Sequence, residues 1–309
     1  MSDFVAPSPT LSVARSRARR LQRTLGAYVR LTKPRVIELL LVTTVPAMVL
    51  AADGVPSLDL VIAVLAGGGL AAGGANTINC WIERDRDQLM RRTRDRPLPA
   101  REILATHALV FGLALEVLAF GLLWATAGLL AAALAIGATL FYVFVYTIWL
   151  KPRSVQNIVI GGAAGAVPVL VGWAAVTGTV GAPAWLLFAI VFCWTPPHFW
   201  ALALRYHDDY AAAGFPMLPV VKGRRAATRQ IVAYSVFVVA VSLALPLVAA
   251  SGIVYGVAAA LLGVALVRES LRLLRDPSSE RAIRMFVFSN TYLALLFAAV
   301  AVDTLVRTS

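Results

Sequence analysis

Residues 58–80 read LDLVIAVLAGGGLAAGGANTINC, and this apolar stretch decides the fold class. A spanning helix needs about 20 mostly apolar residues, so the stretch is long enough to cross a bilayer. Further stretches of the same kind give a total of nine predicted spans, at roughly 36–53, 58–80, 104–124, 127–149, 155–176, 184–204, 230–250, 252–268 and 285–303. Long apolar runs exclude a membrane β-barrel, which has short alternating segments. The sequence therefore predicts an all-α polytopic membrane protein.

The basic residues indicate how this bundle is oriented. The 309 residues include 28 Lys and Arg against 16 Asp and Glu, a formal net charge of +12. In a water-soluble chain this excess would suggest nucleic acid. With nine spans, however, every Lys and Arg except Arg307 falls on the side of the N-terminus. Since that basic side is the cytoplasmic one, we expect a multi-pass protein of the cell membrane with a cytoplasmic N-terminus and no nucleic-acid partner.

The same pattern predicts the domain organisation. Residues 1–27 are Arg-rich and are expected to form a basic, mobile cytoplasmic arm. Residues 28–305 contain all the apolar runs and are expected to form a single intramembrane domain, and residues 306–309 a C-terminal tail.

The second apolar run ends in a polar segment, NTINCWIERDRD, at residues 76–87. If the helix continues through it, Asn76, Asn79, Glu83 and Asp87 share one face. Carboxylate and amide oxygens suit Mg²⁺, and a metal would allow these acids to face a diphosphate without repulsion. The bases of residues 91–96 could then bind phosphate oxygens directly. The alternative is an ordinary cytoplasmic loop whose acids form surface ion pairs.

A second polar cluster follows the sixth run. Residues 194–200 read WTPPHFW, and two prolines inside a span kink the helix and free backbone carbonyls. His198 could ligate haem iron, shuttle a proton or bond a freed carbonyl. Asp208 and Asp209 follow at the same membrane face as Glu83 and Asp87, where they could add a second metal-binding group.

Smaller signals point to the same face of the membrane. Arg30 and Lys33 precede the first span, and Lys151 and Arg153 follow the fourth. Each of these bases could instead be a snorkelling anchor at the bilayer surface. Glu116 lies within the third run and has no evident partner in the sequence.

Together these residues resemble the UbiA superfamily of intramembrane prenyltransferases and, within it, the protohaem IX farnesyltransferases, also called haem O synthases. The resemblance spans about residues 28–305. It rests on the motif Arg30-x-x-Lys33-Pro34 and on four stretches, at residues 79–98, 146–151, 194–200 and 209–219. Two positions depart from the superfamily pattern. Glu83 stands where Asp is frequent, and adjacent Asp208 and Asp209 stand where Asp-x-x-x-Asp is common.

The resemblance implies nine helices around a central apolar cavity and a defined reaction. A farnesyl group would pass from farnesyl diphosphate to a vinyl group of haem B with addition of water, giving haem O for terminal oxidase assembly. Haem A synthase or oxidase assembly factors would be partners, with the lipid bilayer as the surroundings. The implied site residues are Asn79, Glu83 and Asp87 for catalysis; these three with Asp208 and Asp209 for Mg²⁺; Arg30, Lys33, Arg92, Arg94, Lys151 and Arg153 for the diphosphate; and His198, Arg205 and Tyr206 for haem.

Two alternatives stay open at this point. A UbiA-type prenyltransferase of aromatic or quinone precursors would share the first polar segment, so the stretches at 194–200 and 209–219 discriminate against it. A polytopic transporter is the alternative outside enzymes. Transporters often show inverted repeats and midplane sites, whereas this chain has no evident repeat and carries its acids at one membrane face.

Overall fold

The computed structural model describes residues 9–249 and 251–308, with side chains at residues 21–34, 42–249 and 251–308. Within these ranges the regular structure is entirely helical. The elements are α1 (Pro9–Thr32), α2 (Pro34–Ala52), α3 (Leu58–Asp87), α4 (Ala105–Ala127), α5 (Leu129–Leu140), η1 (Phe141–Leu150), α6 (Asn157–Thr177), α7 (Ala182–Arg205), α8 (His207–Ala212), α9 (Leu218–Leu243), η2 (Leu245–Leu247), α10 (Ile253–Arg275) and α11 (Ser279–Thr308).

The predicted all-α membrane architecture is confirmed. In the described part of the chain, eight helical segments are long and apolar enough to cross a membrane, and Val42–Ala52 of α2 adds a shorter apolar one. Each predicted apolar run overlaps a helix of the structure. The count of nine spans and the side of the N-terminus stay predictions.

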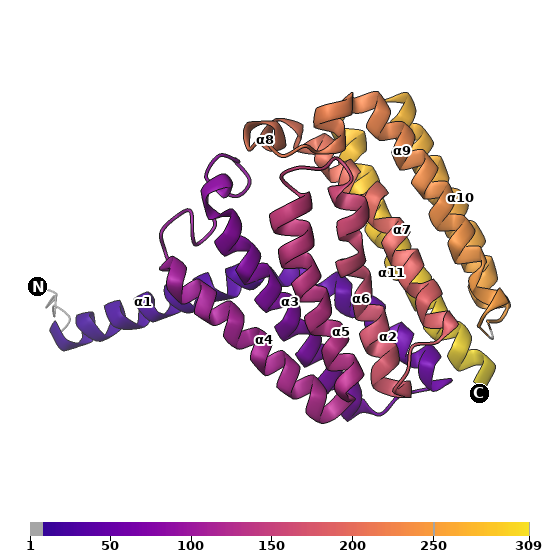
Figure 1. The fold of residues 1–309 in the computed structure, drawn as a ribbon, viewed down its shortest axis with the longest axis horizontal. Coiled ribbons are helices and arrows are strands. Elements are labelled where there is room, and N and C mark those ends of the chain that lie inside the picture. The colour runs from indigo at the N-terminus through magenta and orange to yellow at the C-terminus, as the bar shows by residue number, and fades with distance from the viewer. Residues whose placement is uncertain (1–8, 250, 309) are drawn as a thin grey trace, which may run out of the picture.

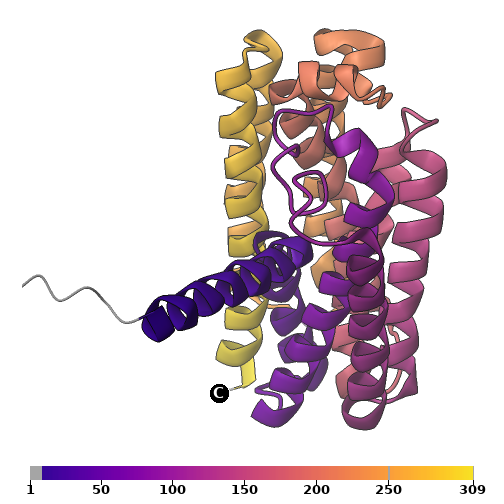
Figure 2. The same ribbon diagram turned by 90° about the vertical axis from the view of Figure 1, so that its left-hand side faces the viewer.

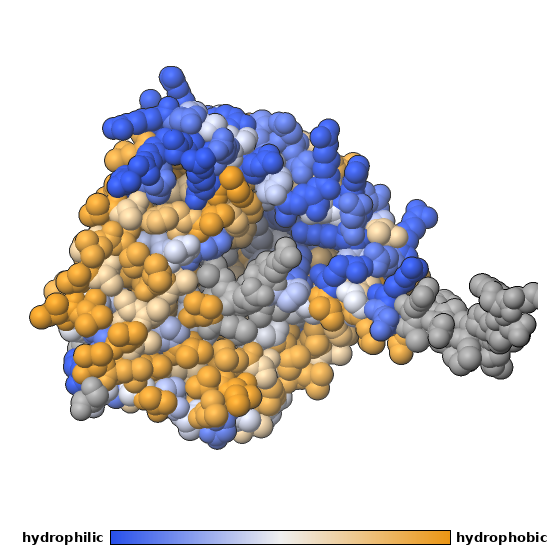
Figure 3. Space-filling model, turned by 180° about the vertical axis from the view of Figure 1, so that it is seen from behind, coloured by the Kyte–Doolittle hydropathy of each residue, from blue (hydrophilic) through white to orange (hydrophobic). Residues whose placement is uncertain are grey.

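The helices pack side by side in one bundle (Figure 1). The loop between α3 and α4 lies with α8 at one end of the bundle, and the C-terminus lies at the other end. The space-filling view shows hydrophilic side chains gathered at the first end and a hydrophobic belt below them (Figure 3). The helix α1 leaves the bundle at its side (Figure 2) and includes residues 9–27 of the predicted arm.

Small residues let α3 approach α4 closely. A Cβ atom at Gly74 would lie 2.6 Å from Oε1 of Glu116 and 2.9 Å from the carbonyl oxygen of Gly112. Glu116 is buried at this contact and accepts a hydrogen bond of 3.2 Å from the Thr139 hydroxyl on α5. The partner that the sequence did not reveal is therefore Thr139. Small residues and interhelical hydrogen bonds are the usual means of holding helices together in lipid.

The fourth predicted run, 127–149, is two elements rather than one. It begins as α5 and continues from Phe141 as the π-helix η1. At its end the Lys151 amide donates to the Tyr146 carbonyl at 2.8 Å, which is the i→i+5 spacing of a π-helix. Such segments are rare and concentrate at functional sites, so η1 is a candidate part of a functional site.

Candidate active site

Three oxygen-bearing side chains lie on one face of α3 at the hydrophilic end of the bundle. As predicted, the helix continues past the apolar run to Asp87, so Asn79, Glu83 and Asp87 follow one another at intervals of four residues. All three are buried, with exposed fractions of 2%, 4% and 0%. Buried carboxylates are costly unless they are paired, so their partners define the site.

Each of the three side chains contacts a different cation. Lys33 Nζ donates to Asn79 Oδ1 at 2.8 Å. Lys151 Nζ forms an ion pair with Glu83 Oε1. Arg96 Nη1 donates to both carboxylate oxygens of Asp87, at 2.8 and 3.0 Å. The site thus combines three cations with two carboxylates and an amide.

Burial and pairing act on these cations in opposite directions. Burial lowers the pKa of Lys33, whose oxygen partner is a neutral amide. Burial also disfavours the charge of Lys151, but the adjacent Glu83 carboxylate outweighs it and raises the pKa of Lys151. In the same way, Asp87 overcomes the effect of burial and raises the pKa of Arg96. The ion-paired cations are therefore held charged, and Lys33 is the one whose charge is most weakly supported.

Lys33 is placed by a sharp change of direction between α1 and α2. Its backbone has a φ of 53°, in the left-handed region that residues other than glycine rarely adopt. Pro34 follows at once and disfavours a helical conformation at residue 33. Asn76 Nδ2 donates to the Thr32 carbonyl at 3.0 Å and fastens this junction to α3. The junction thereby directs the Lys33 amine to Asn79.

The π-helix η1 supplies the opposite wall of the site. Asn79 Nδ2 donates to Thr147 Oγ1 at 3.2 Å, one turn before the contact between Glu83 and Lys151. α6 approaches η1 closely because residue 161 is glycine: a Cβ there would lie 2.2 Å from the Tyr146 ring. Lys151 Nζ in turn lies 5.8 Å from the centre of that ring. Close packing against α6 therefore fixes the segment that carries Lys151.

Arg92 links the two polar clusters that the sequence predicted separately. Its backbone N–H donates to Asp209 Oδ2 at 3.3 Å, and its guanidinium donates to the Tyr210 hydroxyl at 3.4 Å. The same guanidinium lies over the Tyr206 ring at 5.4 Å. Thr93 Oγ1 donates to the Asp87 carbonyl at 2.9 Å and holds this loop against the end of α3. The loop and α8 together cover the hydrophilic end of the site.

Other predicted site residues lie further from the paired face of α3. Arg30 pairs with Glu102, and Arg153 donates to the carbonyls of Ile148 and Trp149 at 2.8 and 3.2 Å. Arg94 is exposed, as is Arg205, whose guanidinium lies 5.6 Å from the Tyr206 ring. 

Asp208 is also exposed, and a hydrogen bond from His207 lowers its pKa. Together with the contact of Asp209 to Arg92, this places the two adjacent acids on α8 at the edge of the site.

His198 is enclosed between α7 and α11. Its Nδ1 lies 2.8 Å from the Ser289 hydroxyl, and its ring stacks between Trp194 and Phe286, each at a centroid distance of 4.3 Å. Trp194 Nε1 donates to the Ser289 carbonyl at 2.7 Å. The imidazole is thus fixed in orientation by one hydroxyl and two aromatic rings.

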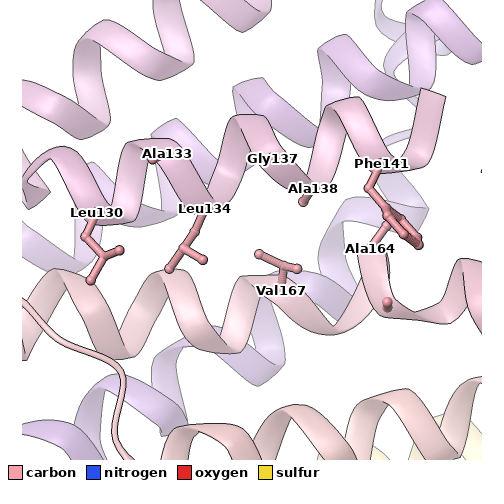
Figure 4. A pocket seen from close by; sticks show the side chains of 9 residues that line it. Leu130, Ala133, Leu134, Gly137, Ala138, Phe141, Ala164 and Val167 are labelled. Carbon is pink, nitrogen blue, oxygen red and sulfur yellow. The ribbon is translucent and has the colours of Figure 1, made fainter. Parts of the chain in front are cut away.

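The described part of the chain has a surface recess and an apolar cavity. The space-filling view shows a recess between the groups of hydrophilic side chains (Figure 3). A second cavity, of about 360 Å³, lies between α5 with the start of η1 and α6 (Figure 4). Its lining is apolar and comprises Leu130, Ala133, Leu134, Gly137, Ala138, Phe141, Ala163, Ala164 and Val167. Small residues on both helices, Gly137 and four alanines, leave this space unfilled.

Three residues of the site were not singled out in the sequence. Arg96 is the arginine of the 91–96 loop that reaches Asp87, Thr147 bonds Asn79, and Phe215 lies 4.7 Å from Lys151 Nζ at its ring centre. Arg96 could be recognised only as one of four arginines in its loop. Thr147 and Phe215 lie within the stretches 146–151 and 209–219 that carry the family resemblance, but their contacts depend on which helices become neighbours.

Known proteins match this chain over nearly its whole length. Residues 40–292 match the UbiA prenyltransferase family. A protoheme IX farnesyltransferase of Parafrankia sp. (strain EAN1pec) is 55% identical over 306 residues, covering 96% of each chain. One of Nostoc sp. (strain PCC 7120 / SAG 25.82 / UTEX 2576) is 53% identical over 286 residues, covering 92% of this chain and 90% of the relative.

Solved structures share the fold at low identity. A digeranylgeranylglyceryl phosphate synthase structure has a TM-score of 0.74 and 18% identity, covering 91% of this chain and 98% of its own. A UbiA homolog from Archaeoglobus fulgidus, bound to GPP and Mg²⁺, has a TM-score of 0.62 and 19% identity, covering 89% and 99%. The fold, the multi-pass helices and the relatives agree. The chain therefore belongs to the UbiA prenyltransferase family and is itself a prenyltransferase, among relatives named protoheme IX farnesyltransferase.

Proposed function

We propose that this chain transfers the farnesyl group of farnesyl diphosphate to a vinyl group of haem B with addition of water, giving haem O. The names of relatives that are 50–55% identical over at least 90% of the chain support the two substrates. The observation that carries the chemistry is the buried face of α3, where three oxygen side chains each contact a separate cation. Such a site suits the departure of an anionic leaving group.

The donor set of this face fits Mg²⁺. Among the residues that the structure describes, no group of three or more His, Cys, Asp and Glu is placed to hold a metal ion. The buried face of α3 has two carboxylates and adds an amide oxygen, so its donors are all the hard oxygen ligands that Mg²⁺ prefers. Asn79, Glu83 and Asp87 would hold the ion, with Asp208 and Asp209 as further carboxylates near the Arg92 loop. When bound, Mg²⁺ neutralises charge on a diphosphate as it leaves.

We propose that the cations of the site bind the diphosphate itself. Lys33, Lys151 and Arg96 converge on one face of α3, and Arg92 lies beside it on the adjoining loop. Fixed cations in a buried site stabilise developing negative charge more strongly than they would in water. Three arginines lie further from this face: Arg30, Arg94 and Arg153. We propose that their charges attract the anionic substrate before it enters the site.

The reaction balances as follows. The bond between the farnesyl C1 and its diphosphate oxygen breaks, and the diphosphate departs with the electron pair. The terminal carbon of a haem vinyl group forms a new bond to C1, which leaves positive charge on the adjacent carbon. Water adds to that carbon and loses a proton, giving a hydroxyethylfarnesyl side chain. The apolar surroundings of the site protect the allylic cation from early capture by water.

His198 is the proposed contact for haem. It lies on α7, and Ser289, Trp194 and Phe286 hold its ring in one orientation. Arg205 and Tyr206 at the end of the same helix are proposed to contact polar groups of haem. The expected readout for His198→Ala is loss of haem-dependent turnover with farnesyl diphosphate binding retained, together with a changed haem absorbance spectrum. An unchanged spectrum would count against ligation.

We assign the site to the cytoplasmic face of the cell membrane, because the arginine-rich loop between α3 and α4 lies at that end of the bundle and the positive-inside rule assigns basic loops to the cytoplasmic side. Haem O would then serve terminal oxidase assembly, with haem A synthase or assembly factors as partners. An inverted orientation in vesicles, read out by protease access to the loop at residues 88–104, would contradict this assignment.

The test of function uses purified protein with haem B, farnesyl diphosphate and Mg²⁺, and measures the product by mass. We expect haem O from the wild-type chain and none from Asp87→Ala or Asn79→Ala. Asp85→Ala is the matched control, because Asp85 is on the same helix but exposed and off the paired face. Near-normal haem O from Asp87→Ala would refute the metal assignment. A product from an aromatic or quinone precursor, but not from haem, would favour the other prenyltransferase reaction.

A further inference from the structure

The second half of α1 carries an apolar stripe that the bundle does not cover. Leu21, Leu25 and Val29 are 60%, 56% and 57% exposed, and they follow one another at intervals of four residues. On a helix this spacing places them on one face. Three large apolar side chains in a row are unusual on a surface that faces water.

The other faces of α1 differ in character. Ala27 and Leu31 are buried in a small core with residues of α3 and of the loop after it, including Cys80 and Leu98. Arg23 and Arg30 lie on the side opposite the apolar stripe, where they line a cavity of about 510 Å³ with Thr24 and Glu102. The helix therefore has one face against the protein, one apolar face and one basic face.

The depth of α1 can be judged from α3. α1 ends beside Asn79, since Lys33 bonds Asn79 and Asn76 bonds the Thr32 carbonyl. About 20 residues separate Asn79 from the start of α3 at Leu58, which at 1.5 Å per residue is about 30 Å. This is about the thickness of the hydrocarbon core of a bilayer. α1 therefore leaves the bundle (Figure 2) at the level of the membrane boundary.

From this placement we propose that α1 lies in the headgroup region of the bilayer, with Leu21, Leu25 and Val29 in the acyl boundary and the exposed Arg23 on anionic lipid. Charge complementarity selects the partner: α1 has no acidic residue, and its sequence includes Arg15, Arg17, Arg19, Arg20 and Arg23. Amphipathic helices with basic polar faces bind anionic membrane surfaces in this way. Because Lys33 directly follows the end of α1 at Thr32, the bound helix also holds that amine at Asn79.

The test measures the depth of single nitroxide labels on the full-length protein in nanodiscs. Leu25→Cys reports the apolar stripe, and Arg23→Cys is the matched control on the basic face. The native cysteines, Cys80 and Cys193, are both buried, and unsubstituted protein controls for their labelling. With phosphatidylcholine and phosphatidylglycerol, we expect the label at 25 to collide severalfold more with oxygen than with an aqueous nickel chelate, and the label at 23 to show the reverse.

Two results would overturn the proposal. Equal access of the nickel chelate to both labels would show that α1 is an arm in water. In nanodiscs of phosphatidylcholine alone we expect the oxygen preference at residue 25 to fall severalfold, and an unchanged preference would refute anionic lipid as the partner. Neither readout depends on farnesylation, so failure of the proposed function leaves this test intact.

Discussion

The ion pair between Lys151 and Glu83 gives the most direct test of how the site is held together. Its two side chains are 12% and 5% exposed, so the charges are largely shielded from water. We expect Lys151→Met and Glu83→Gln each to destabilise the protein, because each leaves one buried charge without its partner. Removing one partner of a buried pair costs about 3–5 kcal/mol.

The structure places the expected cost at the lower end of that range. In Lys151→Met, the positive charges of Lys33 and Arg96 still stabilise the Glu83 carboxylate. Lys151 without Glu83 keeps the Tyr146 and Phe215 rings, at 5.8 and 4.7 Å from Nζ. We therefore expect each single variant to lose about 3 kcal/mol in the free energy of unfolding.

The double variant separates stability from chemistry. With both charges replaced by neutral groups of similar size, no unpaired charge is buried, and we expect a loss of about 1 kcal/mol rather than the sum of the single losses. Turnover should stay absent in the double variant, since we assign Glu83 to the metal ion and Lys151 to the diphosphate. The assay is a denaturant titration in mixed micelles followed by circular dichroism, with turnover measured in parallel. Single losses that add in the double variant would refute the coupling.

Three further predictions concern separate parts of the molecule. Asp303→Ala should lower the free energy of unfolding by about 1–2 kcal/mol and leave turnover per folded molecule unchanged, because Asp303 accepts hydrogen bonds from the N–H groups of Gly252 and Tyr255 at the start of α10. An unchanged denaturation midpoint would contradict this capping role. Burial lowers the pKa of Lys33 from 10.5, so turnover that needs the charged amine should fall as pH rises through that lowered pKa. In Lys33→Arg the alkaline fall should move to higher pH, since a guanidinium keeps its proton, and identical pH profiles would argue against the role of Lys33. Gly161→Ala should destabilise the protein by about 1–3 kcal/mol, because the added methyl group would push Tyr146 aside. Gly165→Ala should leave stability unchanged, because a Cβ there meets open space. Equal stability of the two variants would show that η1 does not need this close approach.

The membrane fold could be predicted because hydrophobicity acts over whole helices. Each apolar run of about 20 residues has one stable solution in lipid, a helix, and each run overlaps a helix of the structure. The shared face of Asn79, Glu83 and Asp87 was predicted on the condition that the helix continues through them, and α3 does extend to Asp87. These are local properties of one segment, and the sequence of that segment contains them.

Other features depend on neighbours and could not be predicted. The composition of residues 127–149 predicts one helix. The second half of this segment is a π-helix, which occurs together with tight packing of Tyr146 against Gly161. The arginines of residues 91–96 are alike in sequence, and only the folded loop distinguishes Arg96 at Asp87 from Arg92 at Tyr210. Similarly, the partner of Glu116 is Thr139 on another helix.

The pairing of the α3 face explains why the site needs its cations even before a substrate arrives. Two carboxylates at 4% and 0% exposure would be costly to bury as free charges. Lys151 and Arg96 remove that cost, and the carboxylates in turn keep both cations charged at the place where a diphosphate would bind. Lys33 has only an amide as its partner, so it is the cation that loses least by turning toward an anion. Stability and the proposed substrate binding therefore depend on the same residues. For this reason, turnover of Lys151 variants must be measured together with their folding.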